Sequence, residues 1–239
     1  MADPSAPPAH PAASLFPPLR VRVTTPRLEL RHATDEEIVA LDTLAGEGIH
    51  DPSSMPFGFP WTDEDPATRG FGTYQAHARK RATWKPDAWA AMFALFVDGE
   101  PAGAQEVGAT EFGIRREVGS GSWIGARFQG RGLGTEMREA MLHFVFEGLG
   151  ALAANSGAYD DNPASNRVST KAGYSRYGVG AVVRRRGSKA PGGESAERAI
   201  EVLYRIEREE RLAHRRDDIV IHRLDDEVLA AFGVTPERA

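Results

Sequence analysis

The sequence has 239 residues, a formal net charge of −5 and a pI near 5.8, and 41% of its residues are hydrophobic. It contains no cysteine, which excludes disulfides, thiolate nucleophiles, iron–sulfur clusters and cysteine-ligated zinc. The acidic balance argues against nucleic-acid or membrane partners. Because we find no apolar run of about 18 residues and no secretory signal, we expect a cytoplasmic protein.

Composition divides the chain into three parts. Residues 1–18 are rich in proline and alanine, which predicts a disordered tail because proline removes backbone donors and fixes φ. Residues 19–208 are expected to form one domain. Residues 209–239 form a C-terminal extension that we expect to pack on this domain or on a dimer partner.

The first half of the domain alternates between strand and helix patterns. Residues 19–31 predict a strand interrupted at Pro26, and Thr34 with Glu37 forms a capping box that predicts a short helix. A proline-rich loop with large apolar residues follows, and a polar helix is expected over about 65–81. Residues 90–107 predict a hairpin with its turn at Asp98 and Gly99, and residues 120–128 predict another strand.

The second half predicts a helix from Thr135, a small-residue strand over 151–159, and a helix capped by Asn162. Arg184–Arg186 and residues 189–195 are expected in a loop before a strand over 197–208, and an appended strand and helix follow. This order predicts an α/β (α+β) fold with a largely antiparallel sheet, not a doubly wound parallel one.

The sharpest local signal is the glycine-rich segment Gln129–Thr135, between a predicted strand and an amphipathic helix. Glycines allow the backbone to approach a ligand, and the unpaired amides of a helix start favour an anion such as a phosphate. The spacing does not fit the Rossmann fingerprint, and no lysine follows Gly134 as a Walker A loop requires. A flexible glycine loop without a ligand is the structural alternative.

Three segments together resemble the GNAT superfamily of acyl-CoA-dependent N-acyltransferases. Gln129–Thr135 is similar to its Q/R-x-x-G-x-G/A signature, and Thr25–Arg31 and Asn162–Tyr174 resemble segments of its RimJ/RimL branch. The resemblance covers about residues 21–208, and the loop at 50–62 is similar to an actinobacterial subgroup that includes succinyl-CoA users. It implies a GNAT fold whose mixed, mostly antiparallel sheet is flanked by helices and splayed between the fourth and fifth strands.

The resemblance also implies a donor site for acetyl-CoA or succinyl-CoA, without a metal. Backbone amides would hold the CoA pyrophosphate, and the preceding strand would pair with pantetheine and polarise the thioester carbonyl. The residues implied in cofactor binding are Trp123, Ile124, Gly125, Gln129, Gly130, Arg131, Gly132, Leu133, Gly134, Thr135 and Asn162. The N-cap role of Asn162 is a structural alternative that is compatible with binding.

Two serines are the candidate catalytic residues. Ser165 matches the position that protonates the departing thiolate in ribosomal-protein acetyltransferases of this branch, although a serine there also commonly bonds to backbone. Ser169 stands where other members carry a tyrosine acid.

The glutamate base of RimL-type enzymes has no counterpart, because Arg184–Arg186 occupy the corresponding stretch. A lysine amine costs about 4.6 kcal/mol to deprotonate at pH 7, whereas an α-amine costs about 1.1 kcal/mol. We therefore expect either an acceptor with a low pKa or a water-linked carboxylate from Glu106, Glu111 or Asp51.

On the acceptor side, the loop with Met55, Phe57, Phe59 and Trp61 is expected to wall the entrance. The candidate substrate residues are Asp51, Met55, Phe57, Trp61 and Glu111. A primary amine is the expected acceptor, on a protein N-terminus, a lysine or a small molecule, and a homodimer is expected. Arg127 or Arg184–Arg186 could hold the distal carboxylate of a succinyl group.

Three alternatives stay open. One is a non-catalytic acyl-CoA sensor, and another is a succinyltransferase acting on protein lysines. The third is a nucleotide- or dinucleotide-binding enzyme of different chemistry.

Overall fold

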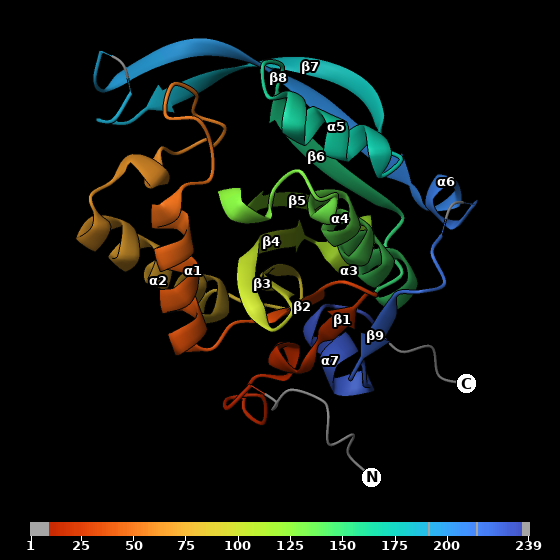
Figure 1. Cartoon of the computed structure of the whole chain (residues 1–239). Helices are drawn as coiled ribbons and strands as arrows, with labels where there is room; N and C mark the ends of the chain where they lie inside the picture. The colour runs from red at the N-terminus through yellow and green to blue at the C-terminus, as the bar shows by residue number, and fades with distance from the viewer. Residues whose placement is uncertain (1–9, 191, 214, 236–239) are drawn as a thin grey trace.

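A nine-stranded open sheet with helices on both faces forms the protein (Figure 1). This computed structural model describes residues 10–190, 192–213 and 215–235. The strand order is β7-β8-β6-β5-β4-β3-β2-β1-β9, and every neighbouring pair is antiparallel except β5–β6. The predicted mixed, mostly antiparallel α/β fold is confirmed.

The strands are β1 (Arg22–Thr24), β2 (Glu29–His32), β3 (Ala88–Val97), β4 (Glu100–Thr110), β5 (Glu117–Ile124), β6 (Ala153–Tyr159), β7 (Ser175–Arg186), β8 (Ser195–Glu207) and β9 (Val220–His222). The helices are α1 (Asp35–Glu47), α2 (Pro66–Ala82), α3 (Phe112–Arg115), α4 (Leu133–His143), α5 (Pro163–Lys171), α6 (Arg208–Ala213) and α7 (Asp226–Ala231). Single turns of 3₁₀ helix lie at Pro17–Arg20, Trp61–Asp63 and Ala126–Phe128, and α4 continues into a π-helical turn, Phe144–Gly148.

The two faces of the sheet follow the alternation of β3. Phe93 and Leu95 pack in the main core together with Met137 of α4, whereas Ala94 and Phe96 pack with Leu41 of α1. Successive strand residues point to opposite faces, so the near-continuous apolar run of β3 is explained by helices on both sides. Helices α4 and α1 therefore cover opposite faces of the sheet.

Local capping signals in the sequence set the helix starts. Thr34 and Glu37 form the predicted capping box of α1, Asp65 caps α2, and Asn162 caps α5 by accepting from the Ser165 backbone N–H. The interrupted strand at Pro26 is a hairpin of β1 and β2.

The sheet forks between β5 and β6, which are the fourth and fifth strands when the β1–β2 segment is counted as one. Their parallel pairing runs from Glu117 and Ala153 to Ser120 and Ser156, and no pair follows. Beyond Ser120, β5 pairs only with β4, through Ile124, and β6 pairs only with β8. The predicted splay is therefore present, with its closed end at Ser120 and Ser156.

The sequence placed Arg184–Arg186 in a loop, and that expectation is wrong. These residues end β7, a long edge strand paired with β8 along its whole length. Gly178 and Gly180 in this stretch weaken the local strand signal, and the pairing with β8 overrides it.

Residues on both sides of the expected domain pack against it. Residues 1–9 of the predicted tail lie outside the described residues, but Ala13 is buried and Arg20 donates to its carbonyl, so packed structure begins before residue 19. In the C-terminal extension, β9 pairs with β1 and the side chain of Phe232 is fully buried against Trp84 and Trp89. Residues 219–235 thus pack on their own chain.

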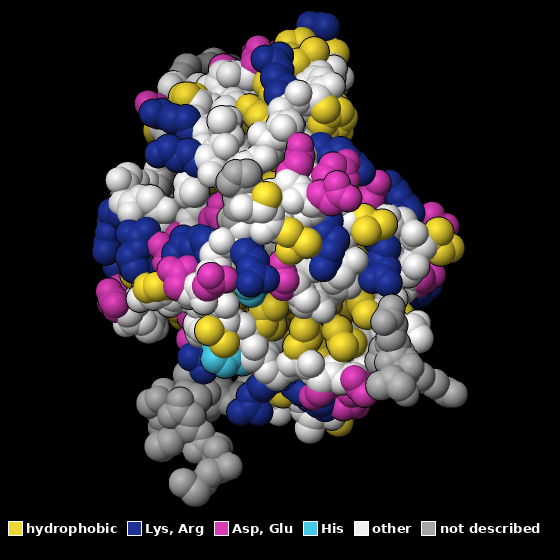
Figure 2. Space-filling model, turned by 90° about the vertical axis from the view of Figure 1, so that its right-hand side faces the viewer, with side chains coloured by type: hydrophobic (Ala, Val, Ile, Leu, Met, Phe, Trp, Pro, Cys, Tyr) yellow, Lys and Arg dark blue, Asp and Glu magenta, His cyan; other side chains and the backbone are white. Residues whose placement is uncertain are grey.

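Charged side chains of both signs are interspersed over the face in Figure 2. Among the described helices, none combines the length and the apolar character needed to cross a membrane. Within the same residues, no group of three or more His, Asp or Glu side chains is arranged to hold a metal ion.

Candidate active site

The predicted glycine loop leads from the end of β5 into α4. Gly130 and Gly132 have φ values of +74° and +80°, a left-handed backbone that glycine adopts at little cost. Gly132 is the N-cap and provides no side-chain hydrogen bond to α4. The first backbone N–H groups of α4 can therefore bind an anion, as an uncapped helix start favours.

Side chains fix this loop from behind. The Gln129 amide nitrogen donates to the backbone oxygens of Ile124, at 2.7 Å, and Ile49, at 2.6 Å. Arg27 donates to the Arg131 carbonyl at 3.0 Å. The Gln129 side chain thus holds the loop against β5. The main-chain N–H groups of the residues that follow Gln129 remain available to a ligand.

One other residue of the predicted cofactor set, Gly125, has a packing reason to be glycine. A Cβ on Gly125 would lie 2.5 Å from the nearest Leu44 side-chain atom, whereas a Cβ on Gly134 would make an ordinary contact with Val168 at 3.4 Å. Leu133 faces the core and is 2% exposed. Any contact of these residues with a cofactor therefore comes from their backbone.

The unpaired edge of β5 lies between this loop and the fork. Trp123 and Ile124 are the last residues of β5, opposite Ala104 and Gly103 of β4. Within the part of the chain that the structure describes, no strand pairs with their other edge. This edge can accept an extended ligand as an additional strand would.

Helix α5 begins beside the open end of the fork. The Asn162 side chain accepts from the Ser165 N–H at 3.1 Å, and Asn166 holds α5 to the Tyr159 carbonyl of β6 at 2.9 Å. The Ser165 side chain is partly exposed. Ser169 is fully buried and its hydroxyl has no hydrogen-bond partner among the described residues, so the interior packing of α5, not an open cleft, surrounds this second candidate.

A cavity of about 780 Å³ lies on the α1–α2 face of the sheet. Phe57 and Trp61 of the predicted acceptor loop line it together with Trp123. The rings form a chain, with 5.4 Å between the centroids of Phe57 and Trp61 and 5.8 Å between those of Trp61 and Trp123. The acceptor loop and the donor strand therefore meet at Trp123.

Charged groups line the same cavity. Lys80 of α2 forms an ion pair with Glu106 of β4, with 2.6 Å between Nζ and Oε1. Burial, with the positive charges of Arg81 and Lys80, lowers the pKa of His77 to about 4. His77 is consequently neutral at pH 7, and Glu106 is the carboxylate in the cavity that comes from the central sheet.

Sequence reasoning missed the α2 side of the cavity. Phe71, His77 and Lys80 line it, but the helix was interpreted only as polar. His77 and Lys80 are three positions apart and so share one helix face, a signal that depends on knowing which face meets the sheet.

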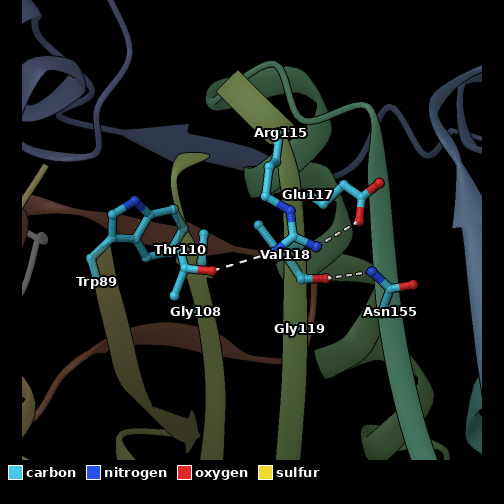
Figure 3. A pocket seen from close by; sticks show the side chains of 9 residues that line it. Trp89, Gly108, Thr110, Arg115, Glu117, Val118, Gly119 and Asn155 are labelled. Carbon is cyan, nitrogen blue, oxygen red and sulfur yellow. Dashed lines mark hydrogen bonds and ion pairs between the residues drawn. The ribbon is translucent and has the colours of Figure 1, made fainter. Parts of the chain in front are cut away.

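Three predicted substrate residues do not line the cavity. Met55 is 3% exposed and packs within the protein, and the Asp51 carboxylate accepts from the backbone N–H and hydroxyl of Ser53, which lowers its pKa. Glu111 follows the far end of β4, seven residues and about 23 Å along the chain from Ala104. There Thr110, Arg115 and Glu117 line a separate cavity of about 290 Å³ (Figure 3).

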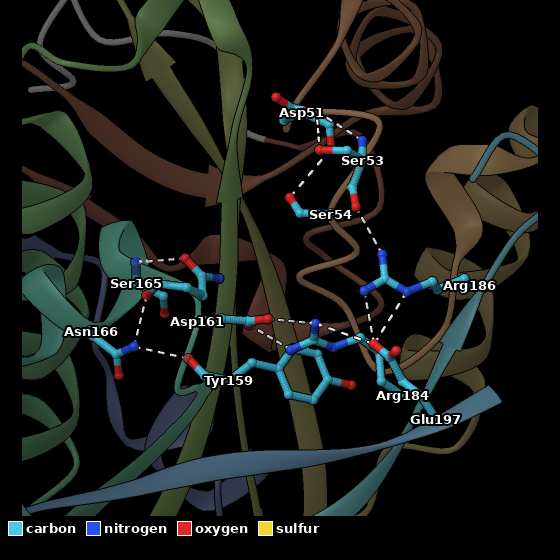
Figure 4. A network of polar contacts seen from close by, with 11 residues as sticks. Asp51, Ser53, Ser54, Tyr159, Asp161, Ser165, Asn166, Arg184, Arg186 and Glu197 are labelled. Atoms are coloured by element: carbon cyan, nitrogen blue, oxygen red, sulfur yellow. Dashed lines mark hydrogen bonds and ion pairs between the residues drawn. The ribbon is translucent and has the colours of Figure 1, made fainter. Parts of the chain in front are cut away.

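The β7–β8 hairpin contacts the predicted acceptor loop. We call the contacts of residues 186–189 with residues 53–64 the bridge. Arg186 donates to the Ser53 carbonyl at 2.8 Å (Figure 4), the Gly187 N–H donates to the buried Asp63 carboxylate at 3.1 Å, and Lys189 donates to the carbonyl of Thr62.

Three of the arginines considered for a succinyl carboxylate, Arg127, Arg184 and Arg186, form ion pairs within the protein. Arg184 binds both oxygens of Asp161, at 2.8 and 2.5 Å, and lies over the Tyr159 ring. The guanidinium of Arg184 lowers the pKa of Asp161. Arg186 pairs with Glu197, and Arg127 pairs with Glu47 and Glu100.

Comparison with known proteins matches this arrangement to one family. The family model described as an acetyltransferase (GNAT) domain matches residues 27–175. Among solved structures, the chain is similar to RimL, a ribosomal L7/L12 alpha-N-protein acetyltransferase in complex with coenzyme A, with 20% identity and a TM-score of 0.57 over 77% of this chain and 95% of that one.

Two further similar structures also carry a ligand. RimJ of Mycobacterium smegmatis, in complex with CoA-disulfide, shows 18% identity and a TM-score of 0.59, covering 79% of this chain and 87% of that one. The microcin C7 self-immunity acetyltransferase MccE, in complex with acetyl-CoA and AMP, shows 18% identity and a TM-score of 0.56 over 76% and 93%. These likenesses show the fold, and the family match covers most of the chain: the protein belongs to the GNAT acetyltransferase family.

Proposed function

We propose that the protein transfers an acyl group from a CoA thioester directly to a primary amine. The observation that carries this proposal is that the two halves of the site meet on one strand. The fork and the α4 loop border β5 on one side, and Gly121, Ser122 and Trp123 of the same strand line the acceptor cavity. Placing two reactants on one strand supplies much of the rate by proximity.

The residues that border the fork fit an acyl-CoA donor. The α4 loop offers uncapped backbone N–H groups for the diphosphate, and the open edge of β5 at Trp123–Gly125 offers main-chain groups for pantetheine and the thioester carbonyl. The partly exposed Ser165, held on α5 by the Asn162 cap, would donate its proton to the departing thiolate. The bound donor supplies the activated carbonyl.

Glu106 is the carboxylate that we propose accepts the proton of the acceptor amine, directly or through water. Among the three candidates from the sequence, it alone lines the cavity next to Trp123. Phe57 and Trp61 would contact the apolar part of the acceptor. A protein N-terminus, a lysine or a small amine all fit this chemistry, and the low deprotonation cost of an α-amine favours the first.

The acyl group is proposed to be acetyl or succinyl. The internal pairs of Arg127, Arg184 and Arg186 remove the support that the sequence offered for succinyl binding at those positions. From the sequence alone we also propose a cytoplasmic homodimer.

A turnover experiment tests this function. The full chain is incubated with acetyl-CoA or succinyl-CoA and a panel of small amines, a peptide with a free N-terminus and a lysine peptide, and thiol release and product mass are measured. We expect stoichiometric thiol and amide. Glu106→Gln should lower kcat/KM by about 100-fold, as loss of a general base does, whereas Glu111→Gln, just past the end of the same strand, should not.

Two results would contradict the proposal. CoA binding without thiol release from any amine would favour the non-catalytic sensor, and equal rates for the two variants would remove Glu106 from the reaction.

A further inference from the structure

One buried arginine lacks the partner that the others have. The buried arginines of the described residues are Arg69, Arg138, Arg184 and Arg211. Arg69 pairs with Asp42, Arg184 with Asp161 and Arg211 with Glu139. Arg138 is 2% exposed, yet the described part of the chain offers no carboxylate oxygen within 4 Å of its guanidinium.

The guanidinium of Arg138 lies at the closed end of the fork. From α4 it donates to the hydroxyl of Ser156 on β6 at 2.9 Å and to that of Ser122 on β5 at 3.3 Å. Ser156 belongs to the last pair between these strands, and Ser122 lies two residues past it. Arg138 thus spans the two strands where they separate.

Its hydrogen bonding is also incomplete. A guanidinium has five N–H donors, and the Nε of Arg138 is buried without a partner among the described residues. The Tyr174 ring lies beside it, 5.7 Å from Cζ to the centroid, and the hydroxyl of this tyrosine is likewise buried and unpartnered. A buried charge held only by neutral groups is costly unless a counter-ion completes it.

We propose that Arg138 binds the distal carboxylate of a dicarboxylic acyl donor, such as succinyl-CoA. This rests on the proposed function, because the fork is where that function places the thioester end of the donor. Ser122 borders both Arg138 and the acceptor cavity, so the carboxylate would lie next to the reacting carbonyl. The planar guanidinium presents paired N–H donors that can bind both oxygens of a carboxylate.

The reaction remains a simple acyl transfer. The amine nitrogen forms a bond to the thioester carbonyl carbon, the carbon–sulfur bond breaks, and the amine loses a proton while the thiolate gains one. The products are an N-succinyl amide with a free carboxylate and CoA thiol, and Arg138 holds the carboxylate throughout without changing its charge.

Binding of two matched thioesters tests the assignment on the unaltered protein. Succinyl-CoA and butyryl-CoA have the same chain length and differ by a carboxylate in place of a methyl group. Calorimetry should give at least tenfold tighter binding of succinyl-CoA, about 1.4 kcal/mol. Equal affinities, with both esters bound, would overturn the role of Arg138 while leaving the proposed function intact; no binding of either ester would overturn the proposed function itself.

Variants then connect the preference to this side chain. Arg138→Met should abolish the preference for succinyl-CoA. Arg138→Lys should keep only part of it, because lysine lacks the planar guanidinium group. Arg127→Met, which removes an exposed arginine paired with Glu47 and Glu100, should retain the full ratio. Thermal unfolding of each variant checks that it is folded, and a full preference in folded Arg138→Met would contradict the proposal.

The alternative ligand of Arg138 is a carboxylate on the acceptor amine instead of one on the acyl donor. With acetyl-CoA as donor, amines with and without a carboxylate should react with the same ratio of kcat/KM in the natural protein and in Arg138→Met. A change in that ratio would assign Arg138 to the acceptor and overturn its role toward the donor.

Discussion

Ser165 and Ser169 lie one turn apart on α5, yet the fold gives their hydroxyls different surroundings. Ser165 is partly exposed beside the fork, and Ser169 is fully buried with an unpartnered oxygen. A hydroxyl can protonate a thiolate only if it reaches the sulfur, so the exposed position is the one suited to catalysis.

This difference predicts opposite outcomes for two alanine variants. Ser165→Ala should lower kcat by 10- to 100-fold with little change in donor affinity, because the acid acts only as the thiolate leaves. Ser169→Ala should leave kcat unchanged and raise or maintain the Tm, since it removes a buried unsatisfied oxygen. Steady-state kinetics and thermal unfolding measure both, and a loss of kcat in Ser169→Ala alone would reverse the assignment.

Single residues were predictable where the signal is local. The conformation of Gly130 and Gly132 and the N-cap role of Asn162 follow from sequence neighbours. The isolation of Arg138 could not be predicted, because its partners come from two strands that the chain brings together only in the folded sheet.

At the scale of elements, α2 lines the proposed acceptor cavity with a neutral histidine, His77. The pKa of His77 falls from 6.5 to about 4 on folding because of burial, then Arg81 and Lys80. Between pH 6.5 and 4 the unfolded chain therefore binds more protons at this histidine than the folded chain does. The stability of the folded protein is unaffected by this group above pH 6.5 and decreases as the pH falls toward 4.

Over this pH range the protonation of His77 is expected to lower the free energy of unfolding by about 3 kcal/mol, at 1.36 kcal/mol for each pKa unit. Urea unfolding at pH 7, 5.5 and 4.5 should show it, with a smaller slope in His77→Gln. The pKa values of His10 and His32 are also lowered by burial, so the variant should keep a reduced slope. An unchanged slope would show that His77 does not carry this proton linkage.

The bridge between the β7–β8 hairpin and the acceptor loop is the second element with a testable role. Asp63 is 5% exposed and accepts from the Gly187 N–H. Asp63→Ala leaves that donor buried and unpaired, which should destabilise the protein by about 1–3 kcal/mol.

We expect Asp63→Ala to raise the acceptor KM severalfold while the donor Kd stays constant. Lys189→Met, which removes an exposed contact of the same bridge, should have a smaller effect. A weaker donor affinity with an unchanged acceptor KM would contradict this prediction, because it would show that the bridge supports donor binding instead of acceptor binding.

Elements with their own start signals were predicted well. The capping box of α1, the polar helix expected over about 65–81 and the Asp98–Gly99 hairpin are all present. The strand β7 was missed because glycines and Arg184–Arg186 suggest a loop locally, and only pairing with β8 makes this segment a strand.

On the scale of the whole molecule, one sheet lies between the proposed donor and acceptor sites. In the proposed function, the α4 loop and the fork bind the donor, the cavity under α2 binds the acceptor, and β5 borders both. The family resemblance implied a donor site at the glycine-rich segment, but the sequence could not tell which of the candidate carboxylates lines the cavity. Glu106 and Glu111 are five residues apart, and only the register of β4 with β5 places the first beside Gly121 and the second at the far end.

The proposed function requires that main-chain groups at the start of α4 hold a diphosphate beside the fork. Titration calorimetry of the full chain with CoA, acetyl-CoA and pantetheine, which lacks the diphosphate, tests this directly. We predict one molecule of CoA or its ester bound per chain, and at least tenfold weaker binding of pantetheine. An absence of heat with CoA and its esters, or equal affinity for pantetheine, would contradict it.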